Sequence, residues 1–313
     1  MKAYVYERYG SPEVLEIREV ARPAVSDGNV LIRVRSSCVN MADWRFLTGT
    51  PRVLRLVAGL VKPKQRILGL DVAGTVEAVG KAVTRFQPGD EVFATTDDMG
   101  GFAEYMSVSE DGAVPIPANM THEEAAAVPV SALTALQGLR DRGKIRAGQK
   151  VLINGASGGV GTFAVQIAKS FGAEVTGVCS TANLDTARSI GADHVIDYTE
   201  EDVVTSGRRY DLILDIVGNL PLADCRRMLT RHGIYVAAAG EPLRLLWIGM
   251  TGGKGMLTFV SRPNREDLVF LKELLEAGEV KPVIDRRYPF HEIPDALRYL
   301  GEGHARGKVV ITM

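Results

Sequence analysis

At 313 residues the chain is long enough for about two domains. Its hydrophobic content of 46% is ordinary for a globular protein, and its net charge of −1 favours neither nucleic acid nor a membrane as a partner. The three cysteines form no CxxC pair, which argues against a disulfide framework or a thiolate zinc site. The N-terminus has no signal-peptide pattern and no apolar run reaches membrane-spanning length, so a cytoplasmic protein is expected.

The first 120 residues predict short strands separated by turns that contain glycine and proline. This spacing is typical of a small β-barrel or sandwich. The expected strands are 4–6, 15–17, 30–35, 72–79 and 91–94.

From Thr121 onward the pattern changes to alternating helices and strands. Thr121 and Glu124 have the spacing of a capping box, in which each residue satisfies a backbone N–H of the other. The alternation predicts a parallel sheet with helices on both faces, and therefore an α/β fold. Helices are expected at 131–140, 185–190 and 221–229, and strands at 194–196, 210–217, 233–238 and 257–260.

One stretch, 151–180, contains the parts of a dinucleotide-binding βαβ unit. An apolar strand is followed by a glycine-dense turn, an amphipathic helix and a second apolar strand. The turn reads Ala156-x-Gly158-x-x-Gly161, so alanine stands where the usual fingerprint begins with glycine. Glycine lets the backbone approach a pyrophosphate, and the helix N-terminus offers N–H groups to it.

Beyond residue 278 the short-strand pattern of the first domain returns. A helix is expected at 265–277, followed by a strand at 284–290, a short helix at 293–300 and a strand at 309–311. We therefore expect residues 1–121 and 268–313 to form one domain and residues 122–267 to form the dinucleotide-binding domain.

Five motifs follow one another along the chain: Gly69-x-Asp71-x-Ala73-Gly74, Gly101-Phe102-Ala103-Glu104-Tyr105, the glycine turn, Gly191-Ala192-Asp193 and Gly307-Lys308-Val309-Val310. In this order they resemble the medium-chain dehydrogenase/reductase superfamily, and most of all its zinc-independent quinone-oxidoreductase-like members. The resemblance covers essentially the whole chain. It implies a GroES-like catalytic domain, a Rossmann domain, an active site in the cleft between them, and a homodimer extended through the Rossmann sheet edge.

The ligands that zinc-dependent members of the superfamily use are missing from this chain. Aligned on the segment ending at Asp43, the catalytic cysteine position is Asn40, and the following His-Glu pair is replaced by Leu70-Asp71. The third ligand region, around Ser131, contains neither cysteine nor histidine. Zinc needs converging sulfur or nitrogen ligands, so no metal site is expected. Cys38 is expected to be a small core residue.

The strand after the glycine turn ends without the carboxylate that binds the ribose 2′-hydroxyl of NAD. Ser180, with Asn183 and Tyr198, matches positions that contact the 2′-phosphate in relatives, so NADP(H) is the expected cofactor. The alternative is that Ser180 only caps the strand end and discrimination is poor. The resemblance also assigns the turn and the segments that meet the nicotinamide amide, which are Ala156, Ser157, Gly158, Gly159, Val160, Gly161, Ala239, Gly240, Phe259 and Val260.

Four residues are candidates for the catalytic set. Asn40, Asp43 and Arg45 lie on a segment that lines the cleft in relatives, and Thr134 matches a position near the nicotinamide ribose. Arg45 is a candidate to stabilise an enolate or hydroquinone anion, or else an exposed solvated arginine. Asp43 has the alternative of organising its own loop through backbone hydrogen bonds.

The apolar stretch 53–61, together with Trp44 and Phe46, is a candidate wall or lid for an apolar pocket; the alternative is an ordinary packed helix. The expected reaction is hydride transfer from NADPH to a quinone or an α,β-unsaturated carbonyl, with no nucleic acid or membrane as partner. Two alternatives stay open: an alcohol or aldehyde dehydrogenase reaction, and a nucleotide-binding sensor with little turnover.

Overall fold

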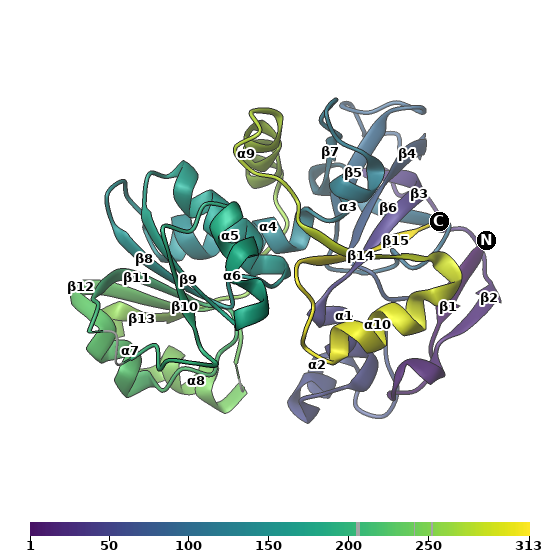
Figure 1. Ribbon diagram of the computed structural model, residues 1–313. Coiled ribbons are helices and arrows are strands. Elements are labelled where there is room, and N and C mark those ends of the chain that lie inside the picture. The colour runs from purple at the N-terminus through teal and green to yellow at the C-terminus, as the bar shows by residue number, and fades with distance from the viewer. Residues whose placement is uncertain (205–206, 241, 252) are drawn as a thin grey trace. The chain divides into compact units, whose positions relative to one another are not determined.

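The computed structural model describes residues 1–204, 207–240, 242–251 and 253–313 (Figure 1). Its contacts divide the chain into two compact units. Unit 1 comprises Met1–Val130, Arg262–Ala277 and Ile284–Met313, and unit 2 comprises Ser131–Ser261 and Gly278–Val283.

Unit 1 is built on a seven-stranded, mostly antiparallel sheet and a separate hairpin of β1 (Lys2–Val5) and β2 (Glu16–Glu19). The sheet order is β14-β15-β3-β4-β5-β7, with β6 also paired to β3. Val310 of β15 lies opposite Cys38 of β3, which confirms that the C-terminus returns to complete the first domain. The strands are β3 (Asn29–Val39), β4 (Asp71–Val79), β5 (Glu91–Thr95), β6 (Tyr105–Ser109), β7 (Ala113–Pro115), β14 (Ile284–Pro289) and β15 (Lys308–Thr312).

Two helices of unit 1, α1 and α10, share a hydrophobic core. The buried residues Ile293, Ala296 and Leu297 of α10 pack in one core with Leu47 of α1. The helices are α1 (Met41–Thr48), α2 (Arg55–Ala58), α3 (His122–Ala126), α9 (Arg265–Glu276) and α10 (Ile293–Gly301). Across the described residues of both units, we find no helix with the length and apolar character needed to cross a bilayer.

Unit 2 is a six-stranded parallel sheet with the order β10-β9-β8-β11-β12-β13. Numbered within the unit, this is the 3-2-1-4-5-6 order of a Rossmann fold, in which ligands bind beyond the carboxyl ends of the strands. The strands are β8 (Lys150–Asn154), β9 (Glu174–Cys179), β10 (His194–Asp197), β11 (Tyr210–Asp215), β12 (Leu229–Ala237) and β13 (Met256–Thr258). The helices are α4 (Pro129–Leu136), whose first two residues belong to unit 1, α5 (Gly159–Ser170), α6 (Leu184–Ser189), α7 (Leu222–Met228) and α8 (Pro242–Thr251), with a π-helical turn at Gln137–Arg142.

The division between the units differs from the boundaries expected from the sequence, 121/122 and 267/268. The first boundary falls after Val130 because α3 packs against β3 and β4 of unit 1. At the C-terminal side the whole of α9, which packs against β7, belongs to unit 1. Residues 278–283 return to unit 2, where the Gln166 amide bonds both the N–H and the carbonyl of Lys281 at 2.9 Å.

Candidate active site

In the glycine turn after β8, the residue with a left-handed backbone conformation is Gly155, which comes just before the fingerprint Ala156-x-Gly158-x-x-Gly161. Gly155 has φ +89°, whereas Ala156 is fully buried and needs no such conformation. The backbone N–H groups of both residues donate to the carbonyl of Val178, at 3.1 and 3.0 Å. Because Gly155 makes the turn, alanine is accommodated at position 156.

The other two glycines of the fingerprint have different physical roles. A Cβ added to Gly161 would lie 2.0 Å from the Gly155 carbonyl oxygen, so this glycine permits the close approach of α5 to the turn. A Cβ at Gly158 would meet only that oxygen, at 3.7 Å, and Gly158 is partly exposed. Gly158 is also the N-cap of α5 and carries no side chain to satisfy the first N–H groups of the helix. These N–H groups are the ones an anionic phosphate can bind.

A buried network at the carboxyl ends of β8, β11 and β12 supports the turn. Asp215 is fully buried and accepts bonds from the Asn154 amide at 2.8 Å, the Gly218 N–H at 2.7 Å and the Tyr235 hydroxyl at 2.7 Å. Arg244 donates to the Tyr235 hydroxyl at 2.9 Å and lies 3.6 Å from Asp215. Burial, with the neighbouring Asp215, raises the pKa of Tyr235. Because every member bonds within the network, it acts as a support for the strand ends.

The three residues expected at the 2′-phosphate lie close together at the end of β9. The Asn183 amide donates to the Ser180 hydroxyl oxygen at 3.0 Å. The Tyr198 N–H bonds the carbonyl of Cys179, the residue just before Ser180, at 3.1 Å, and the Tyr198 side chain is exposed. The tertiary structure therefore gathers positions that are up to eighteen residues apart in the sequence.

One carboxylate, Asp197, stands at the end of the neighbouring strand β10. It accepts bonds from the N–H and hydroxyl of Thr199, at 3.0 and 2.6 Å. Hydrogen bonds from the Thr181 and Thr199 side chains lower the pKa of Asp197. The carboxylate is thus engaged by its own loop, in contrast to the free acid that a ribose 2′-hydroxyl site requires.

The remaining cofactor candidates of unit 2 follow β12 and β13. The Ala238 N–H bonds the Asp215 carbonyl at 2.9 Å, which ties the segment leading to Ala239 and Gly240 to the network. Phe259 is half-buried with its ring over Gly138, whereas the Val260 side chain is 86% exposed. Thr134 on α4 and Ser261 share a hydrogen bond of 2.9 Å between their hydroxyls.

Unit 1 contains a buried cluster of charged and polar groups around Asn40. The Asn40 amide oxygen accepts from the Lys308 ammonium at 2.7 Å, and its nitrogen donates to Asp71 at 3.0 Å and to the Cys38 carbonyl at 3.4 Å. The second oxygen of Asp71 accepts the Val130 N–H at 3.1 Å. Both charged residues are almost completely buried, and burial raises the pKa of Asp71 although the ammonium opposes the shift. Asn40 is fully engaged here and serves to position its neighbours.

Asp43 organises its own loop through backbone hydrogen bonds, which was the alternative to a catalytic role. One carboxylate oxygen accepts the Asn40 N–H at 2.8 Å and the other accepts the Gly69 N–H at 2.9 Å. Asp43 is fully buried at the start of α1, and this burial raises its pKa to about 7. Cys38 is likewise a core residue, since burial raises the pKa of its thiol to about 12.

The raised pKa of Asp43 predicts that stability falls as the pH rises. The unfolded carboxylate has a pKa near its ordinary value, so the folded state binds more protons between about pH 4 and pH 7. The contribution of Asp43 to the free energy of unfolding is therefore largest below about pH 4 and is lost as the pH rises through about 7. Between about pH 5 and pH 8 this contribution should fall by an amount on the order of 2 kcal/mol.

This pH dependence is measurable by urea unfolding of the wild type and Asp43→Asn. We expect the stability advantage of the wild type to shrink by about 2 kcal/mol from about pH 5 to about pH 8. Asp27→Asn, at an exposed aspartate, is the control and should leave the pH profile unchanged. A constant difference between wild type and Asp43→Asn would show that Asp43 stays ionised throughout.

The other candidates on and after α1 have varied surroundings. Arg45 is half-buried, and its guanidinium has no hydrogen bond or ion pair within the described ranges. Trp44 packs on Gly301 of α10, and Phe46 packs against the same core. The stretch 53–61 is not an ordinary packed helix, because most of its apolar side chains are exposed.

The donor set near Asn40 does not fit a zinc ion. The positions of the expected ligands carry an amide, a leucine and a serine, and the Lys308 ammonium already places a positive charge against Asn40. In the part of the chain that the structure describes, no group of three or more His, Cys, Asp or Glu side chains could hold a metal. A zinc-type set of converging sulfur or nitrogen ligands is therefore not formed by these residues.

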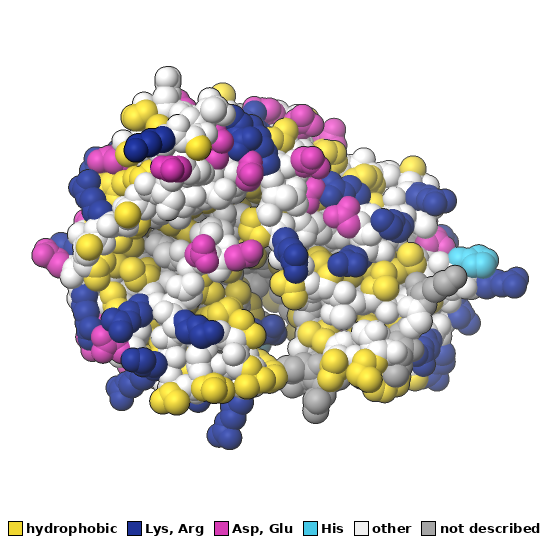
Figure 2. All heavy atoms as spheres, turned by 180° about the vertical axis from the view of Figure 1, so that it is seen from behind, with side chains coloured by type: hydrophobic (Ala, Val, Ile, Leu, Met, Phe, Trp, Pro, Cys, Tyr) yellow, Lys and Arg dark blue, Asp and Glu magenta, His cyan; other side chains and the backbone are white. Residues whose placement is uncertain are grey.

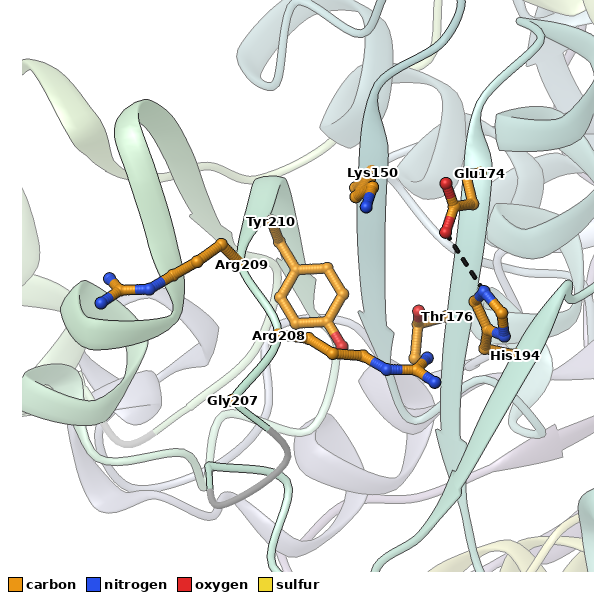
Figure 3. A pocket seen from close by; sticks show the side chains of 8 residues that line it. All are labelled: Lys150, Glu174, Thr176, His194, Gly207, Arg208, Arg209 and Tyr210. Atoms are coloured by element: carbon orange, nitrogen blue, oxygen red, sulfur yellow. Dashed lines mark hydrogen bonds and ion pairs between the residues drawn. The ribbon is translucent and has the colours of Figure 1, made fainter.

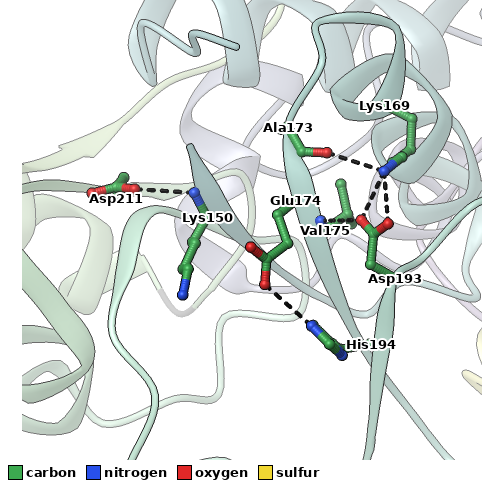
Figure 4. A network of polar contacts seen from close by, with 8 residues as sticks. All are labelled: Lys150, Lys169, Ala173, Glu174, Val175, Asp193, His194 and Asp211. Atoms are coloured by element: carbon green, nitrogen blue, oxygen red, sulfur yellow. Dashed lines mark hydrogen bonds and ion pairs between the residues drawn. The ribbon is translucent and has the colours of Figure 1, made fainter. Parts of the chain in front are cut away.

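A cavity of about 390 Å³ opens at the amino ends of the unit 2 strands, opposite to the end at which the glycine turn lies (Figure 3). It is lined by residues at the amino ends of β8 to β11, including Lys150, Glu174, His194 and Tyr210. Since the glycine turn follows the carboxyl end of β8, this cavity is not part of the dinucleotide site. Figure 4 shows Asp193 nearby, where its carboxylate binds the Lys169 ammonium at 2.8 Å and the Val175 N–H at 2.7 Å.

Two of the cluster residues, Asp71 and Lys308, belong to the sequence motifs given above but were not predicted to form a site. The signal that marks them is a charged residue at the start of an otherwise apolar strand, because buried charges are rarely unpaired. The partners Asn154 and Tyr235 of the Asp215 network carried no such local signal.

Comparison with known proteins matches both halves of the chain. A family described as "Alcohol dehydrogenase GroES-like domain" matches residues 26–118, and one described as "Zinc-binding dehydrogenase" matches residues 190–311. The chain is 33% identical to "Quinone-oxidoreductase QR1, chloroplastic" of Triphysaria versicolor, covering 99% of this chain and 98% of that protein. It is 34% identical to "NADPH-dependent alkenal/one oxidoreductase, chloroplastic" of Arabidopsis thaliana, covering 99% and 79%.

Two solved structures share the fold over essentially the whole length. The quinone oxidoreductase from Coxiella burnetii has a TM-score of 0.91 at 28% identity, covering 100% of this chain and 99% of that chain. The Escherichia coli quinone oxidoreductase complexed with NADPH has a TM-score of 0.84 at 26% identity, with full coverage of both chains.

Proposed function

Because the chain belongs to the medium-chain dehydrogenase/reductase superfamily, in its quinone-oxidoreductase-like branch, and is an NAD(P)H-dependent oxidoreductase, we propose that it uses NADPH, without zinc, to reduce a quinone or an α,β-unsaturated carbonyl. The names of relatives, a quinone oxidoreductase and an alkenal/one oxidoreductase, support these two substrate classes. In both classes the acceptor is a conjugated carbonyl system, so one type of apolar, oxygen-polarising pocket serves both.

The residues at and near the end of β9 support NADPH as the proposed cofactor. Ser180, Asn183 and Tyr198 are gathered there, and the carboxylate at the end of β10, Asp197, accepts hydrogen bonds from Thr199. Hydroxyl and amide donors suit a 2′-phosphate, whereas an ionised acid in their place would repel it. The N–H groups at the start of α5 are the proposed pyrophosphate ligands.

The nicotinamide supplies the hydride when it is bound, and the chain supplies the binding groups and the electrostatic stabilisation. Arg45 is the predicted catalytic residue whose charged group remains unengaged in the described structure, so we assign it the stabilisation of negative charge on the acceptor oxygen. Asn40 and Asp43 act as positioning residues, since their polar atoms are used within unit 1. Thr134 is proposed to contact the nicotinamide ribose, as its position in the family implies.

The proposal is tested by steady-state oxidation of NADPH and NADH against a panel of quinones, enones, aldehydes and alcohols. We expect turnover with quinones or enones, a preference for NADPH, and no loss after chelator treatment. Ser180→Asp should reverse the cofactor preference by lowering kcat/KM for NADPH about tenfold to thirtyfold, because the new carboxylate would repel the 2′-phosphate of NADPH.

Ser189→Asp adds the same charge at an exposed serine on α6 and is the matched control. Stoichiometric bound zinc in the active protein would refute the metal-free reaction. An unchanged kcat/KM for NADPH in Ser180→Asp would refute the 2′-phosphate assignment. Tight NADPH binding with no turnover across the panel would favour a sensor over an enzyme of this specificity.

A further inference from the structure

The segment between α1 and β4 presents apolar side chains to solvent. Helical turns run from Arg52 to Ala58, and Val53, Leu56 and Val57 on them are 50%, 66% and 70% exposed. This i, i+3, i+4 spacing is the one that normally faces a protein core. Leu60 and Val61 follow at 68% and 90% exposure. We call these five residues the 53–61 patch.

The charged residues within the segment that carries the patch are all basic. Residues 51–66 contain five basic residues and no acidic one, although the whole chain has a net charge of −1. The basic residues are Arg52, Arg55, Lys62, Lys64 and Arg66. Figure 2 shows basic and hydrophobic side chains next to one another along the lower edge of the molecule.

Two of these cations are used to hold the segment on unit 1. The Arg55 guanidinium donates to the Gly49 carbonyl at 3.1 Å and lies 4.5 Å from the centre of the Tyr9 ring. The Tyr9 hydroxyl in turn donates to the Gly59 carbonyl at 2.6 Å. Arg66 lies 4.0 Å from Glu7. The patch is therefore anchored from behind while its apolar side chains point outward.

The remaining three cations, Arg52, Lys62 and Lys64, are exposed and have no ion pair among the described residues. Apolar side chains flanked by unpaired cations match the boundary between the headgroups and acyl chains of an anionic bilayer. A second copy of the same patch is a poor occupant, because a two-fold contact would bring like charges together. The charge complementarity thus favours an anionic lipid surface.

We propose that residues 51–66 dock unit 1 on an anionic membrane surface, with the 53–61 patch entering the headgroup boundary and Arg52, Lys62 and Lys64 contacting lipid phosphates. The expectation of no membrane partner came from the net charge of the whole chain, which averages over this local concentration. The docking requires neither cofactor nor substrate, so it is independent of the proposed reaction.

The test is co-sedimentation of the full chain with phosphatidylcholine vesicles, with and without about 30% phosphatidylglycerol. We expect binding to the anionic vesicles alone and its loss in about 0.5 M salt. Lys62→Glu/Lys64→Glu and Leu56→Ser/Val57→Ser should each weaken binding by about tenfold or more.

Matched controls alter the same residue types elsewhere on the surface. Lys81→Glu/Lys144→Glu changes the net charge equally, and Ile17→Ser removes an exposed apolar side chain; both should bind like the wild type. Thermal melts and NADPH binding verify that each variant is folded. Absence of binding to anionic vesicles, or equal loss in patch and control variants, would overturn the proposal. So would a patch-dependent dimer, measured by light scattering, with no effect of the patch on vesicle binding.

Discussion

Gly161→Ala is expected to abolish useful NADPH binding, raising the Kd by about 100-fold or more, which is about 3 kcal/mol. Its methyl group would lie 2.0 Å from the Gly155 carbonyl oxygen and 2.8 Å from the Ala156 backbone, and neither can yield as a side chain does. The start of α5 must then move away from the turn, and the N–H groups proposed for the pyrophosphate move with it. Overpacking should also cost about 1–3 kcal/mol of stability. Fluorescence titration with NADPH and a thermal melt measure the two effects.

Two further glycine variants separate the binding effect from the packing effect. In Gly158→Ala the nearest atom to the new methyl is 3.7 Å away, so stability should stay near wild type while the methyl occupies the space of the phosphate. In Gly249→Ala on α8 nothing lies within 4 Å, and both measurements should be unchanged. Wild-type affinity in Gly161→Ala would mean that the start of α5 is not the phosphate site.

Lys308→Met is expected to cost about 3–5 kcal/mol of stability, because it leaves the buried Asp71 carboxylate without its compensating cation. The effect should be smaller at about pH 5 than at about pH 8, since a carboxyl whose pKa is already raised by burial protonates more readily once the ammonium is gone. Urea unfolding at the two pH values gives the comparison. Lys81→Met, at an exposed lysine, is the control and should change stability little.

The double variant Lys308→Met/Asp71→Asn tests the pairing directly. Without the ammonium, the Asn40 amide is free to turn so that its oxygen accepts from the new amide at position 71. The double variant should therefore be more stable than Lys308→Met alone, with a coupling on the order of 2 kcal/mol. Additive losses would show that Asp71 and Lys308 do not act as a pair.

The local elements of the fold were predicted well where the deciding residues are neighbours in the chain. The capping box at Thr121 and Glu124 forms as expected, with N–H to oxygen distances of 3.2 and 2.8 Å. The strand, glycine turn, helix and strand over 151–180 are β8, α5 and β9. By contrast, β6, β7 and α8 were not assigned, because short strands and an apolar, glycine-flanked helix carry weak periodic signals.

The candidate site was only partly predictable. The turn and the missing carboxylate near Ser180 follow from the βαβ pattern, whereas Ser180, Asn183 and Tyr198 were matched to positions in relatives, and the structure places these three residues close together. Asn40 was a catalytic candidate because its segment lines the cleft in relatives, and in the structure its amide group bonds Asp71 and Lys308. No spacing rule connects these three residues, which come from the end of β3 and the starts of β4 and β15.

The sequence by itself determined the α/β architecture and the dinucleotide turn, since the alternation of helical and strand patterns and the βαβ pattern need only residue types and their order. The missing zinc ligands follow from the residue types at the positions that the family resemblance assigns. Only the tertiary structure decided that Gly155, and not the alanine after it, makes the turn, because backbone conformation follows from the strands that the turn joins. It also decided which buried carboxylate meets which cation, and that the apolar face of 51–66 points outward. Those outcomes depend on how distant strands close on one another, which no local pattern records.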